Sequence, residues 1–74
     1  MKNIEALIDE GGHISIGALE TYECVAVASD HHNSLAMLVR RDGETLAALV
    51  KRLDKAIALA WSDEVFTDEV NPAN

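Results

Sequence analysis

The stretch TLAALVKRLDKAIALAW, residues 45–61, constrains the fold of this chain more than any other segment. Its apolar residues recur at steps of three and four, which is the period of a helix with one buried face. That face would hold Leu46, Leu49, Val50, Leu53, Ile57, Ala60 and Trp61. Thr45 can cap the first turn through its hydroxyl, and neither Gly nor Pro interrupts the stretch. The pattern therefore predicts a long amphipathic helix that must cover an apolar surface elsewhere in the chain.

The segments before this helix have the composition of β-strands. HISIGAL, TYECVAVAS and SLAMLVRR carry many Ile, Val and Leu residues and the single Tyr of the chain, and the polar run from Asp30 to Asn33 separates the last two segments. They predict antiparallel strands over residues 13–18, 21–29 and 34–41. In the second strand Cys24, Ala26 and Ala28 share a face whose small side chains would let a helix approach closely. The pattern leaves open which face of the sheet is buried.

The first ten residues, MKNIEALIDE, predict a short helix over residues 3–9 that ends at Gly11 and Gly12. The whole chain then reads as one α+β domain over residues 1–71, followed by a loose tail over 72–74. Its sheet would be a three-stranded antiparallel meander covered by the long helix, with the short helix beside it. The expected core comprises Ile14, Ile16, Val25, Val27, Leu35, Met37 and Val39 together with Leu46, Leu49, Val50, Leu53, Ile57 and Trp61.

The net charge of the chain limits the kinds of molecule that it can bind. Thirteen acidic and six basic side chains among 74 residues give a net charge of −7, which argues against direct binding to nucleic acid. The acids lie in two flanks around a basic stretch over residues 40–55. A single cysteine, the lack of a basic-then-apolar leader and the lack of a long apolar run predict a cytoplasmic location with no membrane contact.

The residues with catalytic or metal-binding chemistry form no recognised motif. Asp30, His31 and His32 are adjacent, and His13 and Cys24 are possible additions to a zinc site, but no spacing typical of a zinc motif occurs. Cys24 with a histidine would be a nucleophile and its base, yet the strand pattern places Cys24 on a small-residue face, where burial would make it inert. The sequence therefore predicts no enzyme, no cofactor and no metal.

Two surfaces are candidates for binding a protein partner. The first is acidic and consists of Glu20, Glu23, Asp63, Glu64, Asp68 and Glu69, which would offer carboxylates to a basic, nucleic-acid-binding protein. The second lies on the side of the long helix away from its apolar face and consists of Ala48, Arg52, Lys55 and Leu59. The simpler interpretation of the acids, that they keep a small protein in solution, stays open.

The motifs NSLAMLVRR, GETL, RLDKAI and DEVN, within residues 33–71, resemble a recurrent pattern in small proteins of bacterial genomes and prophages that have no assigned activity. The order of three strands and a helix is also similar to antitoxins of the HicB type, although their Pro-Gly loop and DNA-binding segment do not occur here. In size and charge the chain is similar to phage inhibitors of CRISPR complexes. By analogy, the second and third resemblances imply a small protein that binds another macromolecule.

We therefore expect a small acidic, non-catalytic protein-binding module, such as a phage or prophage inhibitor of a nucleic-acid-binding host complex, or an antitoxin-like protein. The alternative is a homo-oligomeric accessory protein, in which a sheet edge or the helix pairs with a second copy as a homodimer. Both interpretations follow from the lack of a catalytic constellation and from the small size of the domain.

Overall fold

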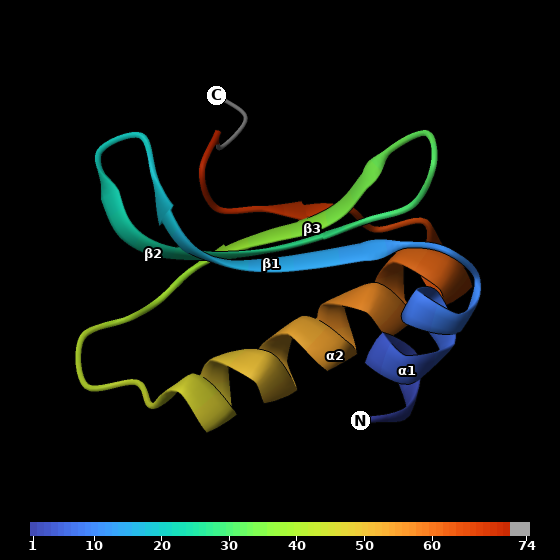
Figure 1. The fold of residues 1–74 in the computed structure, drawn as a ribbon, viewed down its shortest axis with the longest axis horizontal. Coiled ribbons are helices and arrows are strands. Elements are labelled where there is room, and N and C mark those ends of the chain that lie inside the picture. The colour runs from blue at the N-terminus through green and yellow to red at the C-terminus, as the bar shows by residue number, and fades with distance from the viewer. Residues whose placement is uncertain (72–74) are drawn as a thin grey trace.

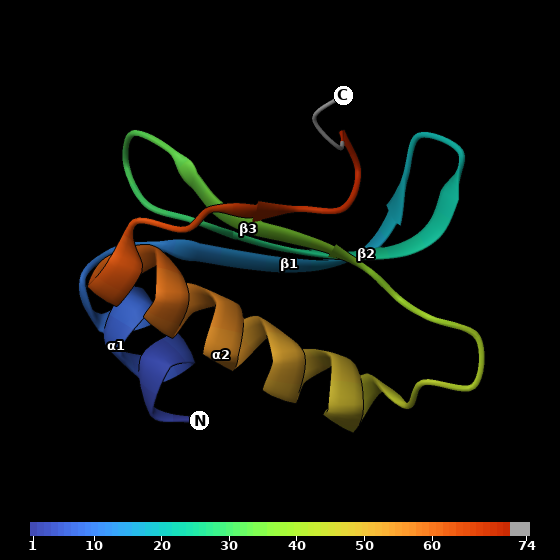
Figure 2. The same ribbon diagram turned by 180° about the vertical axis from the view of Figure 1, so that it is seen from behind.

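Two helices lie on the same face of a four-stranded sheet in this computed structural model, which describes residues 1–71 (Figures 1 and 2). In chain order the elements are α1 (Lys2–Asp9), β1 (His13–Leu19), β2 (Tyr22–Ser29), β3 (Ser34–Val39), α2 (Leu46–Asp63) and β4 (Thr67–Asp68). The α+β class, the two helices and the first three strands agree with the sequence prediction. The predicted loose tail over residues 72–74 lies outside the described residues.

The sheet is mixed, and the prediction of three antiparallel strands alone was incomplete. Its order is β1-β2-β3-β4, with antiparallel pairing between the first three strands and parallel pairing between β3 and β4. A parallel neighbour needs a crossover connection, and α2 supplies it between β3 and β4. The chain after α2 therefore returns to the sheet instead of ending at the helix.

Both ends of α2 have identifiable caps. The Thr45 hydroxyl accepts a hydrogen bond from the Ala48 N–H at 3.1 Å, which confirms the predicted N-cap. The helix extends two residues beyond the predicted end at Trp61, because Glu64 adopts a left-handed conformation with φ of 55°. The Val65 N–H then bonds the Leu59 carbonyl at 3.3 Å. A left-handed Glu lacks the glycine signal by which such an end is recognised in a sequence.

The small-residue face of the sheet is the face that packs against α2. Ala26, Ala28, Ala36 and Leu38 are almost fully buried there, against a helix side that consists of Leu49, Leu53, Ala56, Ile57 and Ala60. The expected core mixed the two faces of the sheet, because it combined Ile14 and Ile16 with Val25 and Val27. The register pairs Ile14 with Ala28 and Ile16 with Ala26, so these isoleucines share the face of the alanines.

Three residues of the expected core are largely exposed. Ile16, Leu46 and Trp61 keep 42%, 50% and 41% of their surface accessible to solvent. Packing against α2 centres on β2 and β3, so Ile16 on the outer strand β1 lies at the border of the contact. Leu46 is the first residue of α2, and Trp61 follows the buried Ala60, so its side chain projects from a different side of the helix.

Asp54 of α2 holds the start of α1 across the molecule. Its carboxylate accepts hydrogen bonds from the backbone N–H groups of Asn3 and Ile4 at 3.0 and 2.9 Å, and from the Asn3 side chain at 3.0 Å. Burial acts to raise the pKa of Asp54, but these hydrogen bonds favour the charged form more strongly and lower it. Asp54 thereby replaces the side-chain cap that Met1 does not provide. Among residues 1–71, no helix has the length and apolar character needed to cross a membrane.

Leu53→Asp should unfold the protein, because it places a carboxylate at a fully buried position of the core. Removing a buried leucine side chain alone costs roughly 2–5 kcal/mol, and the buried charge adds to that loss. Leu59→Asp makes the same chemical change at a site on the same helix that is 42% exposed, and it should keep a cooperative melt. Thermal unfolding followed by circular dichroism compares the two. A native-like melt of Leu53→Asp would contradict the assigned core.

Candidate functional site

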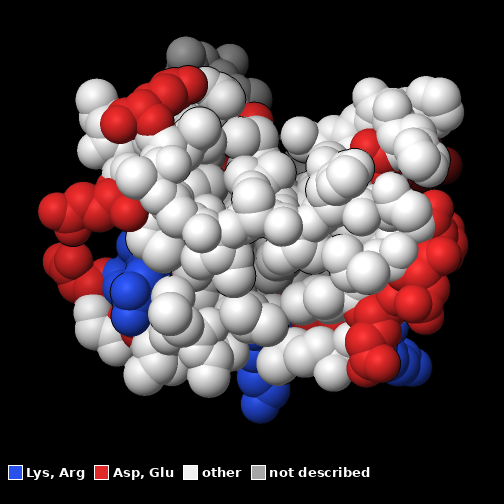
Figure 3. Space-filling view, in the orientation of Figure 1, with Lys and Arg blue, Asp and Glu red and all other residues white. Residues whose placement is uncertain are grey.

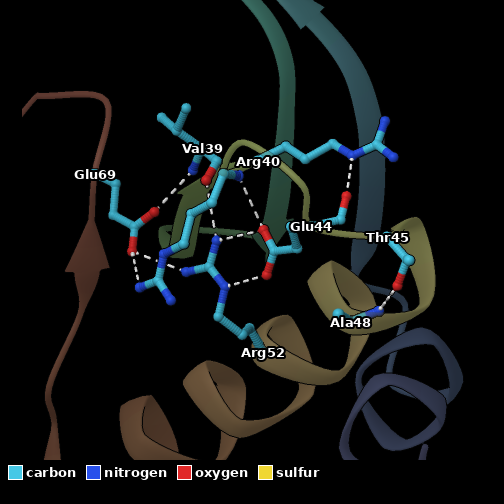
Figure 4. A network of polar contacts seen from close by, with 8 residues as sticks. Val39, Arg40, Glu44, Thr45, Ala48, Arg52 and Glu69 are labelled. Atoms are coloured by element: carbon cyan, nitrogen blue, oxygen red, sulfur yellow. Dashed lines mark hydrogen bonds and ion pairs between the residues drawn. The ribbon is translucent and has the colours of Figure 1, made fainter.

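Arg52 is the centre of a polar network that joins α2 to three other segments (Figure 4). Its guanidinium forms two hydrogen bonds with the Glu44 carboxylate, at 2.7 Å from Nε and 3.0 Å from Nη2. The same group donates to Glu69 at 3.0 Å and to the Val39 carbonyl at 3.0 Å. The network therefore connects the helix with the end of β3, the loop before α2 and the segment after β4.

The ionisation of Glu44 depends on this arrangement. The hydrogen bond from Arg52, together with one from the Arg41 backbone N–H, lowers the pKa of Glu44 from an ordinary 4.5 to about 2. In return, the hydrogen bond to Glu44 raises the pKa of the Arg52 guanidinium. The Glu69 carboxylate also accepts a hydrogen bond from the Val39 N–H at 2.9 Å. Both carboxylates and the guanidinium are thus fixed by bonds inside the fold.

This network contains one residue from each of the two surfaces that were predicted to bind a partner. Arg52 and Glu69 were both predicted to bind a partner, but their charged atoms are already bonded to groups of the same chain. Side chains that are fixed in this way can form the wall of a binding site without having to be ordered when a partner arrives. Their first role is structural.

A shallow groove of ≈ 230 Å³ runs between α2 and β4. Its walls consist of Leu38, Arg52, Lys55, Ala56, Leu59, Thr67 and Glu69. Three of the four predicted helix residues therefore line one groove, whereas Ala48 is exposed but does not line it. Leu59 is 42% exposed in the wall of the groove, and Lys55 is exposed beside it. The arrangement suits an apolar side chain with a polar or acidic neighbour.

The predicted acidic residues do not form one continuous surface. Glu20 and Glu23 lie at the β1–β2 hairpin, whereas Asp63 and Glu64 lie at the far end of α2 (Figures 1 and 2). All four are exposed. Asp68 accepts hydrogen bonds from the N–H groups of Val70 and Asn71 at 3.0 and 2.8 Å, so its carboxylate stabilises the turn after β4. Only the first two pairs present carboxylates without a bonding role in the described fold.

A larger open hollow, of ≈ 610 Å³, lies between the start of β2 and the loop before α2. Residues 21–24 and 39–45 line it, and they include Cys24 and the two arginines at the end of β3. Arg40 donates to the Glu44 carbonyl at 2.8 Å, and Arg41 lies 4.0 Å from the Glu69 carboxylate. The first interaction ties Arg40 to the loop before α2, and the second places Arg41 beside the segment after β4. The hollow thus offers a polar surface without a group of side chains that converge on one point.

The histidines and Cys24 are not gathered into a site. His13 pairs with Ser29, five residues along β2 from Cys24, so roughly 16 Å of strand separates them. The rings of His31 and His32 lie 6.5 Å apart in a loop where Asp30 accepts two backbone N–H bonds of 2.7 Å. These bonds lower the pKa of Asp30. Over residues 1–71 no three His, Cys, Asp or Glu side chains lie close enough together to hold a metal ion.

No protein-family model matches this chain, and no curated protein or solved structure matches it. The likeness to small prophage proteins and to HicB-type antitoxins stays a prediction.

Glu44→Gln should flatten the acid limb of the stability curve. The folded pKa of about 2 lies below the ordinary 4.5, so Glu44 contributes stability above pH 4.5 and loses it as the pH falls toward 2. Urea unfolding at a series of pH values from neutral to strongly acid measures this slope. Asp42→Asn removes an exposed carboxylate from the same loop and serves as the control. An equal acid slope in wild type and Glu44→Gln would reject the role of the Arg52 bond.

Proposed function

We propose that this protein works by binding another protein and catalyses no reaction. The observation that carries the proposal is the groove between α2 and β4, where the exposed Leu59 lies beside Lys55 and the fixed polar groups of Arg52 and Glu69. An apolar side chain within a rim of ordered polar groups is typical of the centre of a protein–protein contact.

The charge of the chain supports a basic partner. A net charge of −7 attracts a positively charged protein over a distance, and such steering acts mainly on the rate of association. Asp63 and Glu64 are exposed at the end of α2, only one turn beyond Leu59. They are the carboxylates nearest along the helix to the groove that are not bonded within the fold. A nucleic-acid-binding protein has the basic surface that this arrangement would attract.

A second function, that of a homo-oligomeric accessory protein, is supported by a different feature. β1 is an edge strand, and its sequence HISIGAL contains no Asp, Glu, Lys or Arg. Edge strands without charges pair readily with other strands. This alternative concerns the opposite side of α2 from the groove, so the two functions need not exclude one another.

Leu59→Asp should weaken binding of the partner at least about tenfold, because it places a charge in the apolar wall of the groove. The partner is first captured from the native host with tagged wild-type protein and identified, and the affinity of the purified pair is then measured by calorimetry. Ala47→Asp adds the same charge at an exposed position of α2 that does not line the groove, and it should bind as wild type does. Equal affinities of wild type and Leu59→Asp would reject the groove as the binding site.

Neutralising the exposed acids should reduce both the association rate and its dependence on salt. The double change Asp63→Asn with Glu64→Gln removes two carboxylates near the groove, and Glu20→Gln with Glu23→Gln removes two at the distant hairpin. Stopped-flow association at low and high ionic strength compares the two variants, and the first should lose more of its salt dependence. If neither variant differs from wild type, steering by these acids is rejected, while a contact through Leu59 would still stand.

A further inference from the structure

The outer edge of β1 is open in the fold. β1 is the first strand in the sheet, so β2 is its one neighbour among residues 1–71. Arg40 donates to the Cys24 carbonyl, which directs the backbone groups of Cys24 toward β3 and, by alternation along β2, those of Val25 toward β1. Val25 pairs with Gly17. The backbone groups of Gly17 therefore point toward β2. Because this direction alternates from residue to residue along β1, the N–H and C=O groups of Ile14 and Ile16 point away from the sheet.

The face of the molecule around this edge is uncharged at its centre. In Figure 3 the Asp, Glu, Lys and Arg side chains lie around the rim, and the middle of the view is formed by other residues. This view has the orientation of Figure 1, in which β1 is the strand nearest the viewer. About a quarter of the residues in the chain are charged, so a broad uncharged face is a local property and not an average of the surface.

Exposed apolar side chains accompany the edge. Ile16 is 42% exposed on the helix side of β1, and Leu46 is 50% exposed at the start of α2. Leu46 and the half-buried Val50 precede Asp54 by two turns and one turn, so all three lie on the side of α2 that faces α1. An edge strand with unpaired backbone groups and apolar neighbours is a surface that another strand can extend.

We propose that a second copy of this chain pairs with β1, antiparallel and around a two-fold axis at Ser15. In that register Ser15 lies opposite Ser15 of the second copy, Ile14 opposite Ile16, and His13 opposite Gly17. Residues 13–17 are the regular part of β1, because the irregularity in its pairing with β2 begins after Gly17. The outward backbone groups of Ile14 in each copy would form hydrogen bonds with those of Ile16 in the other, so the contact occurs twice. The two sheets would then become one eight-stranded sheet.

Charge favours a second copy over another partner at this edge. Two chains of net charge −7 repel each other, and an uncharged strand is the part of the surface where they can approach most closely. A basic partner would find no carboxylate on β1 to bind. In Figure 1, α1 lies at the side of the molecule where β1 starts, and α2 begins at the opposite side. The same rotation would therefore bring α1 of one copy toward the start of α2 in the other. That contact would cover Leu46 and Ile8, which are 50% and 47% exposed in the single chain.

Disulfide trapping tests the register directly. Ser15→Cys in a Cys24→Ala background should form an intermolecular disulfide under mild oxidation, since directly opposed residues lie within the reach of a disulfide. The control is Thr21→Cys in the same background, at an exposed position of the β1–β2 turn, and it should stay monomeric. Non-reducing electrophoresis measures the fraction of disulfide-linked dimer in both variants. Equal trapping of the two variants, or no trapping of Ser15→Cys, would overturn the proposed register.

Light scattering after size-exclusion chromatography tests the dimer itself. Wild type should show a species of twice the 8.0 kDa chain mass, and Ile16→Lys should shift it to the monomer while keeping the circular dichroism spectrum. Leu59→Asp, on the groove side, should keep the dimer. Added salt should strengthen pairing between two acidic chains, whereas it should weaken binding to a basic partner, so the two proposals fail independently. A wild-type monomer at all concentrations, or a dimer unaffected by Ile16→Lys, would reject pairing through β1.

Discussion

The ion network of Arg52 is the interaction on which the arrangement of the fold depends. One guanidinium on α2 bonds the loop before the helix through Glu44, the end of β3 through the Val39 carbonyl, and the last segment through Glu69. The bidentate geometry is the strong form of such a pair, and only 8% of the Glu44 side chain is exposed. β4 is only two residues long and offers few backbone bonds of its own. Glu69 therefore contributes much of what holds β4 beside β3.

The close approach of α2 to the sheet explains why a single arginine can reach all three segments. Ala26 and Ala28 of β2 and Ala36 of β3 leave little side-chain volume between sheet and helix. A larger residue at these positions would lift α2 and lengthen the distances from Arg52 to Val39 and Glu69. The small-residue face thus determines the geometry of the network as well as the packing of the core. On the other side of α2 a single side chain again holds a separate segment, because the Asp54 carboxylate fixes the start of α1.

The local patterns of the sequence predicted the elements well. The helical period of residues 45–61, the hydroxyl of Thr45 and the strand composition of residues 13–41 are all signals within one element, and each corresponds to an element of the structure. The predicted sheet did not include the fourth strand, because Thr67 and Asp68 pair only through the return of the chain after α2, and the segment after the helix was expected either to form a short edge strand or to lie against the core. The error in the expected core, which combined residues from both faces of the sheet, had a similar cause. Alternation defines two faces within a strand, but the register between strands decides which faces coincide.

Part of the candidate site could likewise be predicted from local patterns, and part of it depends on contacts between distant segments. Lys55 and Leu59 are one turn apart, so the helical period alone predicts that they share a surface, and both line the groove. The role of Arg52 was missed, because its partners are 8, 13 and 17 residues away along the chain and no periodicity connects them. The one available signal was the acidic residue before the N-cap, Glu44, which was interpreted as part of a resemblance motif and not as an ion-pair partner.

The two proposed surfaces lie on opposite sides of α2, and this has a consequence for how they would act together. The groove borders β4 at one edge of the sheet, and β1 forms the other edge. Pairing through β1 would leave both grooves open at the outer ends of an eight-stranded sheet. The dimer would then present two grooves that face away from each other, and a partner with two matching sites would gain affinity from the linkage without any new contact. The uncharged edge and the exposed acids are then two parts of one arrangement, because repulsion between the copies is weakest along the strand where they meet.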